Sequence, residues 1–457
     1  MTPLSKPTSS PSGQWLFGHF RDFRNDPLGY LTSCAREHGD AVHLRFVNRR
    51  ILLLSNPAQI GEVLLDRQRS FRKHAALRTI ARPALGEGLL LSEGDQWQRQ
   101  RQRTQPAFRS ERIAGYAQVM LDHTASMLAT WQDGDTIELH AQMMALTSRI
   151  VTRCLFGSEL ADQSNAVHEA MDSLTSSFKS RMDSALRLPL FIPTPANRRF
   201  VSGMTRIDRV LARIIDKRRQ APPQLDLLGA LLAITHEDGR PALNDRQLRD
   251  EVATLFFAGH ETTANALTWT HWLLSTHPAV QQRLEQEIDT VLDGRPPTVA
   301  DVPHLDLCRQ VLDESMRLLP PVWIIGREAV SRVEIGSRSI RRGTTVLMSQ
   351  WVVHRDPRWF PDPERFTPER WADGLAERLP PFAYFPFGGG PRICIGAGFA
   401  RMEMVLLLAS MVARFRLTPA PGTRLELLPS LTLRPREGLQ MMVAERKSGH
   451  SDTVRIL

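Results

Sequence analysis

The sequence is poor in cysteine and lacks long apolar runs. Four cysteines occur among its 457 residues, and they are too widely scattered to outline a disulfide framework, a zinc site or an iron–sulfur cluster. No apolar run reaches roughly 18 residues, the length that suits a membrane-spanning helix. Residues 1–20 carry prolines and polar residues where a secretory signal would have an apolar core. We therefore expect a cytoplasmic protein in a reducing compartment, without a membrane anchor.

The interior of the sequence also lacks linkers, repeats and low-complexity segments. A chain of this length allows more than one domain, since domains average roughly 100–200 residues. Without a boundary rich in Pro, Gly or Ser, one large domain is the simpler interpretation. We expect a Pro-rich N-terminal segment over residues 1–26, a single catalytic domain over residues 27–445 and a polar C-terminal tail over residues 446–457.

The charge balance is basic without the patterns of a nucleic-acid-binding protein. Lys and Arg outnumber Asp and Glu by 58 to 49, a net charge of +9. The arginines are spread through amphipathic segments, and there is no basic tail, zinc-finger spacing or basic patch interleaved with aromatic residues. A basic face suits an acidic redox protein better, so we expect no nucleic-acid partner.

Residues 387–396 bring Cys394, on a glycine-rich loop, to the start of a long helix. The glycines and Pro391 exclude regular structure and let the loop lie flat against a large planar partner. From Ala397 onward, apolar residues recur at helical spacing. A thiol at a helix N-terminus meets unpaired N–H groups and the positive end of the dipole, which favour the thiolate. A lone soft thiolate suits haem iron; a buried structural cysteine is the alternative.

The motif Phe-x-x-Gly-x-Arg-x-Cys-x-Gly, formed by Phe387, Gly390, Arg392, Cys394 and Gly396, resembles the haem-binding signature of the cytochrome P450 superfamily. The resemblance implies a haem-thiolate monooxygenase of the soluble bacterial type, with haem b as cofactor. It implies that Cys394 is the axial ligand of the iron and that Arg392 pairs with a haem propionate. It also implies a mainly α-helical fold with a smaller β-region, in which haem lies between a long central helix and the helix after the cysteine loop.

Other positions match the family's propionate contacts. Trp97 and Arg101 are four residues apart in a predicted helix, so they project from one face. The family's Trp-x-x-x-Arg pattern implies that both bind a propionate; an exposed arginine beside a core tryptophan is the alternative. Arg327 matches a further propionate contact. Arg99 and Arg103, on another side of the same helix, are candidates for docking the electron donor.

Residues 244–275 predict a long helix with the stretch AGHETT, residues 258–263, in its middle. Glycine costs about 1 kcal/mol against alanine inside a helix, and threonine hydroxyls compete for backbone carbonyls, so we expect a locally opened helix. The stretch resembles the oxygen-activation motif of the family. This implies that Thr262 bonds the iron-bound dioxygen, that Glu261 supplies protons and that Ala258 lines the pocket. A threonine bonded to its own helix is the alternative.

Glu314 and Arg317 lie three residues apart in a helix predicted over residues 307–318. Such a pair is usually a surface ion pair worth roughly 0.3 kcal/mol. The family joins Glu-x-x-Arg to a downstream arginine in a buried network that braces the cysteine loop. This implies Arg370 as the third member, with Arg365 as second choice. We assign the network to folding and haem retention.

The remaining patterns place elements and pocket residues. We expect helices over residues 27–38 and 278–292, strands over 41–46 and 50–54, short helices over 56–65 and 70–74, and a less regular stretch over 75–90. Residues 425–434 and 439–444 are predicted to form a terminal hairpin. Apart from Ala258, the pocket candidates are Val322, Ile324 and Leu431, with Trp323 and Thr432 as further contacts. Plain core is the alternative for residues 322–324.

The resemblance implies insertion of one atom of O2 into a hydrophobic substrate, such as a fatty acid or a terpenoid, by hydroxylation or epoxidation. No flavin or iron–sulfur segment is present in the sequence, so we expect a separate ferredoxin or flavodoxin with its NAD(P)H reductase. Two alternatives stay open. A peroxide-driven or isomerising haem-thiolate enzyme shares the fold but needs no Glu261–Thr262 pair. A non-enzymatic haem carrier or gas sensor needs neither a proton relay nor an apolar pocket.

Overall fold

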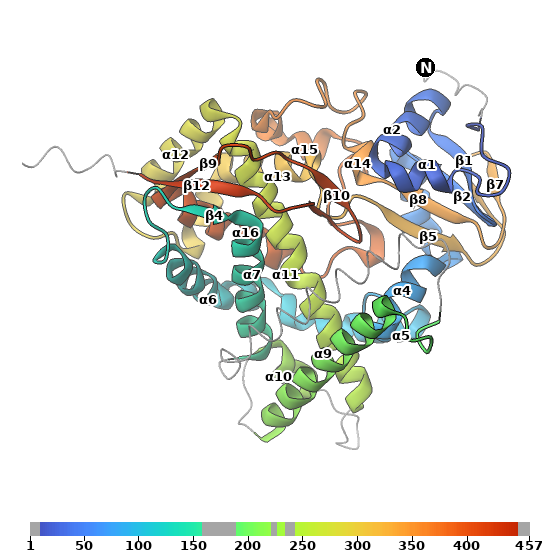
Figure 1. Ribbon diagram of the computed structural model, residues 1–457, viewed down its shortest axis with the longest axis horizontal. Helices are drawn as coiled ribbons and strands as arrows, with labels where there is room; N and C mark the ends of the chain where they lie inside the picture. The colour runs from blue at the N-terminus through green and yellow to red at the C-terminus, as the bar shows by residue number, and fades with distance from the viewer. Residues whose placement is uncertain (1–9, 158–188, 221–225, 234–242, 447–457) are drawn as a thin grey trace, which may run out of the picture.

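A computed structural model describes residues 10–157, 189–220, 226–233 and 243–446 of the chain. Helices dominate this part and surround α11, which crosses the middle of the molecule (Figure 1). The α-helices are α1 (Phe20–Asn25), α2 (Pro27–His38), α3 (Pro57–Gly61), α4 (Ala75–Leu85), α5 (Gly94–Thr104), α6 (Ser110–Leu128), α7 (Leu139–Phe156), α9 (Pro195–Gln220), α10 (Leu227–Leu232), α11 (Asp245–Ser275), α12 (Pro278–Leu292), α13 (Asp306–Leu318), α14 (Gln350–Val353), α15 (Leu375–Arg378) and α16 (Ala397–Arg414). Of the predicted terminal segments, residues 1–9 and 447–457 lie outside the described residues.

The strands of the described part form a five-stranded sheet of order β1-β2-β8-β5-β3, a three-stranded sheet of order β4-β12-β9 and the pairs β10–β11 and β6–β7. In the largest sheet β2 and β8 run parallel and the other neighbours antiparallel. This sheet lies beside α1 and α2, away from the three-stranded sheet (Figure 1). The strands are β1 (Ala41–Phe46), β2 (Arg49–Leu54), β3 (Phe71–Lys73), β4 (Thr136–Glu138), β5 (Ile325–Ala329), β6 (Val333–Ile335), β7 (Arg338–Ile340), β8 (Thr345–Met348), β9 (Phe415–Pro419), β10 (Leu427–Pro429), β11 (Leu433–Pro435) and β12 (Gln440–Glu445).

Helix α11 begins where the sequence predicts it and is buried along most of its 31 residues. Asn244 and Gln247 form a capping box at its N-terminus, which satisfies two otherwise unpaired N–H groups. Gly259 lets α7 approach closely, because a Cβ atom at this position would lie 3.1 Å from Cγ2 of Val151. Close packing on α7 therefore offsets the low helix propensity of this glycine.

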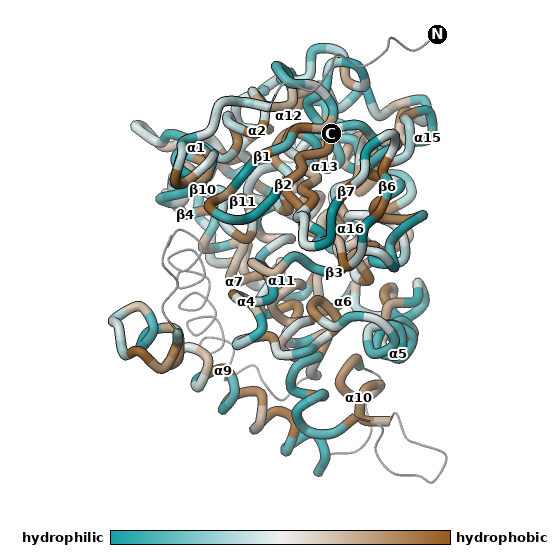
Figure 2. The backbone as a smooth tube through the Cα atoms, turned by 90° about the vertical axis from the view of Figure 1, so that its right-hand side faces the viewer, coloured by the Kyte–Doolittle hydropathy of each residue, from teal (hydrophilic) through white to brown (hydrophobic). Residues whose placement is uncertain are grey.

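Two neighbours of the cysteine loop differ in character. Helix α16 follows the loop directly and packs against α6, α11 and α13, with a buried row that includes Leu406 and Leu407. Helix α5 is hydrophilic along its length (Figure 2), because its sequence is mostly Gln and Arg. One helix therefore anchors the loop in the core, and the other places polar side chains beside it.

Most predicted elements are confirmed, including α2, α12 and the two strands of the first hairpin. The prediction of a short helix over residues 70–74 is wrong, because residues 71–73 form β3 and pair with β5. The expectation of a less regular stretch over residues 75–90 is also wrong in its first half. Helix α4 forms there although it contains Pro83, and it ends at Gly86, whose φ is 58°.

The predicted terminal hairpin is wrong as well. Strand β10 pairs with β11 within residues 427–435, while β12 pairs with β9 and β4. Helix α1 lies within residues 1–26, the segment that we expected to be Pro-rich. Short turns complete the described chain: the π-turn η1 (Glu62–Asp66) and the 3₁₀ turns η2 (Gln68–Ser70), η3 (Gln105–Phe108), η5 (Val299–His304), η6 (Pro368–Gly374) and η7 (Gly390–Arg392).

Candidate active site

The cysteine loop has its own backbone hydrogen bonds. The N–H of Cys394 donates to the carbonyl of Phe387 at 3.0 Å, and the N–H of Ile393 donates to the carbonyl of Gly390 at 3.0 Å. Gly388 and Gly390 have φ values of 72° and 65°, in the left-handed region that favours glycine. A Cβ atom on Gly390 would also collide with the carbonyl oxygen of Leu64. Backbone shape and packing therefore require glycine here, independently of any bound partner.

The Cys394 thiol lies in an unusual environment. Cys394 has accessible surface, yet burial raises the pKa of its thiol, while the N–H of Gly396 and the charge of Arg101 act to lower that pKa. An exposed cysteine whose sulfur has an N–H donor and a cation beside it suits a thiolate that binds a metal.

Helix α5 contacts this loop through the residues that the sequence singled out. Arg101 donates to the carbonyl of Ile393 at 2.8 Å. The guanidinium of Arg392 lies over the Trp97 ring, 4.4 Å from its centroid. Arg392 also pairs with Glu93 and donates to the carbonyl of Ser92 at 2.9 Å. The structure thus brings Trp97, Arg101 and Arg392 to one side of the loop.

Arg327 approaches the same region from the sheet, together with Lys73, which the sequence interpretation missed. Lys73 of β3 and Arg327 of β5 are directly opposite in the antiparallel pair, an arrangement that like charges disfavour. Burial, with repulsion from Arg327 and Arg392, holds the pKa of Lys73 well below its usual range. Burial, with repulsion from Arg392, lowers the pKa of Arg327 to about 10. Cations under such repulsion suit an anionic ligand with more than one negative charge.

One face of α11 is accessible to solvent near the middle of the helix. Ala258 is exposed and Thr262 is partly exposed, although most of their neighbours along the helix are buried. These two residues are four apart and share a face. The Thr262 hydroxyl donates to the carbonyl of Ala258 at 2.9 Å. The expected local opening is wrong, because the helix is continuous through residues 245–275 and the threonine bonds to its own helix.

Glu261 lies beside Thr262 in sequence but is buried, with 1% of its surface exposed. The Thr432 hydroxyl donates to Oε1 of Glu261 at 2.5 Å. We expected Thr432 to contact substrate; its contact with Glu261, 171 positions away, was not predicted from the sequence.

The pocket candidates on residues 322–324 alternate in burial. Val322 and Ile324 are partly exposed, while Trp323 is buried and donates from its indole N–H to the carbonyl of Ser430 at 2.9 Å. Leu431 is partly exposed as well. Three of the four residues are therefore accessible, and Trp323 belongs to the core.

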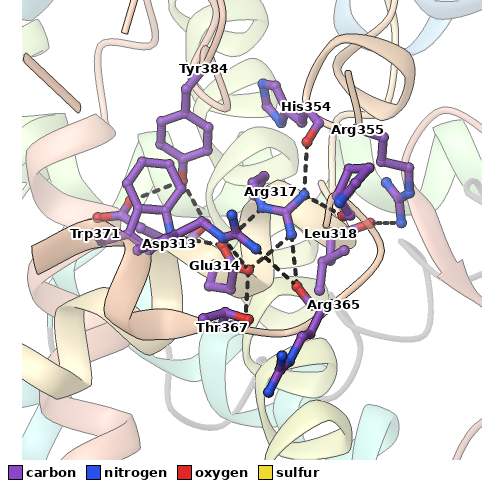
Figure 3. A network of polar contacts seen from close by, with 12 residues as sticks. Asp313, Glu314, Arg317, Leu318, His354, Arg355, Arg365, Thr367, Trp371 and Tyr384 are labelled. Atoms are coloured by element: carbon purple, nitrogen blue, oxygen red, sulfur yellow. Dashed lines mark hydrogen bonds and ion pairs between the residues drawn. The ribbon is translucent and has the colours of Figure 1, made fainter. Parts of the chain in front are cut away.

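Glu314 is the centre of a buried network on α13 (Figure 3). Arg317 donates two hydrogen bonds to its carboxylate, both at 2.9 Å. Arg370 and Trp371 each donate one at 2.9 Å, and the N–H of Thr367 donates at 3.0 Å. The structure thus brings together the three residues that the family pattern implied. Arg365 contributes its backbone carbonyl, which accepts from Arg317 at 3.1 Å.

The network reaches the cysteine loop through two aromatic residues that precede it. The Tyr384 hydroxyl contacts both Oδ1 and the carbonyl of Asp313 at 2.9 Å (Figure 3). The N–H of Phe385 donates to Nε2 of His354 at 3.0 Å, and the carbonyl of His354 accepts from Arg317 at 2.9 Å. The base of the loop is therefore held by hydrogen bonds from α13 and from the residues after α14.

Comparison with known proteins places this arrangement in a family. The family model for cytochrome P450 matches residues 8–443. The chain belongs to the cytochrome P450 family. It is 36% identical to cyclooctatin synthase of Streptomyces melanosporofaciens over 93% of each chain. It is 32% identical to pentalenene oxygenase of Streptomyces avermitilis over 96% of this chain and 98% of the relative.

Solved structures agree with the family. The cytochrome P450DA haem domain aligns with a TM-score of 0.87 at 27% identity, over 98% of this chain and 99% of that one. The retinoic acid-bound cyanobacterial CYP120A1 aligns with a TM-score of 0.85 at 26% identity, over 96% and 100%. This cytochrome P450 is therefore a monooxygenase, and its predicted fold, mainly helical with a smaller β-region, is confirmed.

The residues of this cytochrome P450 fit the haem-thiolate cofactor that the family implies. Cys394 is exposed, and Lys73, Arg327 and Arg392 form a repelling cluster that two propionates would neutralise. Throughout the part of the chain that the structure describes, no helix is long and apolar enough to cross a membrane.

Proposed function

We propose that this cytochrome P450 inserts one atom of O2 into an apolar terpenoid, by hydroxylation or epoxidation. The observation that carries the proposal is the exposed Cys394, whose thiol has the N–H of Gly396 and the charge of Arg101 acting to lower its pKa. The accessible residues Ala258, Val322, Ile324 and Leu431 would give an apolar pocket. The relatives named cyclooctat-9-en-7-ol 5-monooxygenase and pentalenene oxygenase support a terpenoid over a fatty acid.

In this proposal haem b, when bound, supplies oxygen binding and the oxidising chemistry. Cys394 would hold the iron, and the N–H of Gly396 and the charge of Arg101 favour the thiolate form of its sulfur. Lys73, Arg327 and Arg392, the last with its guanidinium over the Trp97 ring, would hold the propionates. Phe387, whose carbonyl accepts from Cys394, shapes the loop.

On the opposite side, Thr262 and Glu261 handle protons. The Thr262 hydroxyl, on the accessible face of α11, would release its bond to the Ala258 carbonyl and donate its proton toward the pocket. Glu261 would supply the proton, and burial keeps bulk water away from its carboxyl group. The apolar pocket residues orient the substrate and exclude water.

The first test is the ferrous carbon monoxide difference spectrum of the wild type and of Cys394→Ser. We expect the wild type to give the red-shifted band of a thiolate ligand and the variant to lose it, because a serine hydroxyl is a harder ligand than a thiolate. Circular dichroism would check that the variant is folded. A folded wild type that binds haem without this band would overturn the proposal and favour a haem carrier.

The substrate class can be tested by spectral titration. Cyclooctat-9-en-7-ol and pentalenene are expected to change the haem spectrum at lower concentrations than dodecanoic acid does. The reverse order would assign the pocket to fatty acids. Product formation with hydrogen peroxide alone, at the rate reached with electron donors, would instead indicate a peroxide-driven enzyme.

We further propose that a ferredoxin or flavodoxin, reduced by its NAD(P)H reductase, docks on α5. Arg101 joins this helix to the cysteine loop, Arg99 is exposed and Arg103 is partly exposed. Arg99→Glu should slow reduction several-fold at low salt and less at high salt, because salt screens surface charges. Arg206→Glu on α9, also exposed, is the matched control. A reduction rate indifferent to salt and to Arg99 would contradict this docking site.

A further inference from the structure

Glu261 accepts a hydrogen bond from a turn that contains Leu431, one of the proposed pocket residues. Thr432 lies in the turn between β10 and β11, is 5% exposed, and donates its hydroxyl proton to Oε1 of Glu261 at 2.5 Å. A threonine hydroxyl has one proton to donate, so this contact uses it. The neighbouring Leu431 is partly exposed and packs with its buried part against the main core cluster, so the residue beside this hydrogen bond lies at the edge of the core.

The turn is fixed on both sides of Leu431. Before it, the carbonyl of Ser430 accepts from the Trp323 indole at 2.9 Å. After it, the carbonyl of Leu433 accepts from the Trp269 indole of α11 at 3.3 Å, and the N–H of Leu433 donates to the carbonyl of Pro321 at 2.8 Å. The position of Leu431 is thus set by the same few contacts that place the Thr432 hydroxyl.

The helix geometry separates Glu261 from the accessible face. Ala258 and Thr262 share that face, and successive residues of an α-helix point about 100° apart. Glu261 is accordingly buried and points toward the hairpin turn, where Thr432 holds its carboxyl group. To transfer a proton to a group bonded by Thr262, the carboxyl group has to leave Thr432.

We propose that Thr432 is a positioning residue that holds Glu261 withdrawn, and that displacement of the Leu431 turn by a pocket ligand releases it. The inference rests on the proposed role of Glu261 as proton supplier. A ligand that pushes Leu431 also moves the adjacent Thr432. The Thr432 hydroxyl therefore links occupancy of the pocket to the availability of Glu261 as a proton donor. When the pocket is empty, Glu261 stays withdrawn, and the enzyme does not consume oxygen without forming product.

Measuring oxygen consumption in the absence of an organic ligand tests whether Glu261 is released from Thr432. Thr432→Val keeps the shape of the side chain and removes the donor, while Thr432→Ser keeps the donor. In holoenzyme supplied with a ferredoxin and its reductase, we expect Thr432→Val to raise ligand-free oxygen consumption about tenfold, from the usual strength of a hydrogen bond to a carboxylate. Thr432→Ser should stay near the wild type. Adding Glu261→Gln to Thr432→Val should abolish the rise; a rise that persists would mean that Glu261 is not the group released.

Infrared spectroscopy tests the hydrogen bond without turnover. The infrared band of the Glu261 carboxyl group is identified by its loss in Glu261→Gln. This band should shift in Thr432→Val but not in Thr432→Ser. In the wild type, which needs no variant to fold, 1-dodecylimidazole should shift the same band, because its imidazole binds haem iron and its tail fills the pocket. An unshifted band in either experiment would overturn the inference while leaving the proposed function intact. Failure of the Cys394 spectrum would instead remove the proposed function.

Discussion

Glu314 on α13 and Glu251 on α11 are both buried carboxylates, with 0% and 1% of their surface exposed. Glu314 accepts hydrogen bonds from two guanidinium groups, an indole and a backbone N–H. The hydrogen bond to Glu251 comes from the N–H of Leu89 at 3.1 Å. Burial raises the pKa of Glu251 to about 7, against the lowering effect of that N–H.

The difference in hydrogen-bond partners distinguishes the side beneath the cysteine loop, where the carboxylate is held by cations, from the α11 side, where the carboxyl group can titrate. Beneath the cysteine loop, the charge of Glu314 is compensated by cations that are buried with it. On α11, Asp250 and Glu251 accept hydrogen bonds from the N–H groups of residues 87 and 89 at 2.9 and 3.1 Å. Within the part of the chain that the structure describes, no cation lowers the pKa of Glu251. We conclude that the thiolate side favours rigidity and that the α11 side responds to protonation.

The largest effect is expected when the side beneath the cysteine loop is disrupted. Glu314→Gln leaves Arg317 and Arg370 buried without their counter-charge, which should lower the free energy of unfolding by about 3–5 kcal/mol and release haem. Asp306→Asn is the matched control, because Asp306 and Arg309 form an exposed i,i+3 pair on the same helix. That change should cost at most about 0.5 kcal/mol. Urea unfolding followed by circular dichroism and haem absorbance measures both; equal losses would contradict the comparison.

A smaller effect is expected from the titration of Glu251. The folded protein holds this proton to about pH 7 and the unfolded chain to about 4.5, so the folded state binds more protons between these values. The free energy of unfolding should therefore fall as pH rises through this window, by roughly 2–3 kcal/mol, and level off above it. Glu251→Gln keeps an acceptor for the Leu89 N–H and should remove this contribution. Glu314→Gln should retain it; a wild type without any such slope would contradict the assignment.

The smallest effect concerns the contact between α7 and α11. Gly259→Ala places a methyl group 3.1 Å from Val151, and the crowding, partly offset by better helix propensity, should cost about 1 kcal/mol. In the double variant with Val151→Ala the two losses of stability should not add. The methyl group introduced at residue 259 would occupy the space left by the side chain of Val151. Thermal unfolding of the four proteins measures this coupling. Additive losses would mean that the helices do not meet at this position.

Features whose cause is local in sequence could be predicted. The capping box of α11 spans three residues, and the cysteine loop and the Glu314–Arg317 pair are contiguous patterns. The role of Lys73 was not predictable in this way, because it depends on the pairing of β3 with β5 across more than 250 residues. The bond between Thr432 and Glu261 and the pairing of β12 with β9 and β4 also depend on tertiary contacts, which override local propensity.

Some correct predictions had the wrong physical reason. The glycines of the cysteine loop were attributed to a flat partner, but positive φ angles and the approach of Leu64 already require them. Helix α4 was not predicted. Its Pro83 lies in the last turn, where it removes few hydrogen bonds, and Ile80, Ala81, Ala84 and Leu85 are buried around it.

The contact of Gly390 with the carbonyl of Leu64 has a consequence for biosynthesis. A ribosome releases residue 64 long before residue 390, so the N-terminal partner of the cysteine loop waits for most of the chain to be made. Closing a contact over such a separation is entropically costly and slow. The contact between Gly390 and Leu64 can therefore form only after most of the chain has been made, and a nascent chain that ends before Cys394 lacks the thiolate that we propose as the haem ligand.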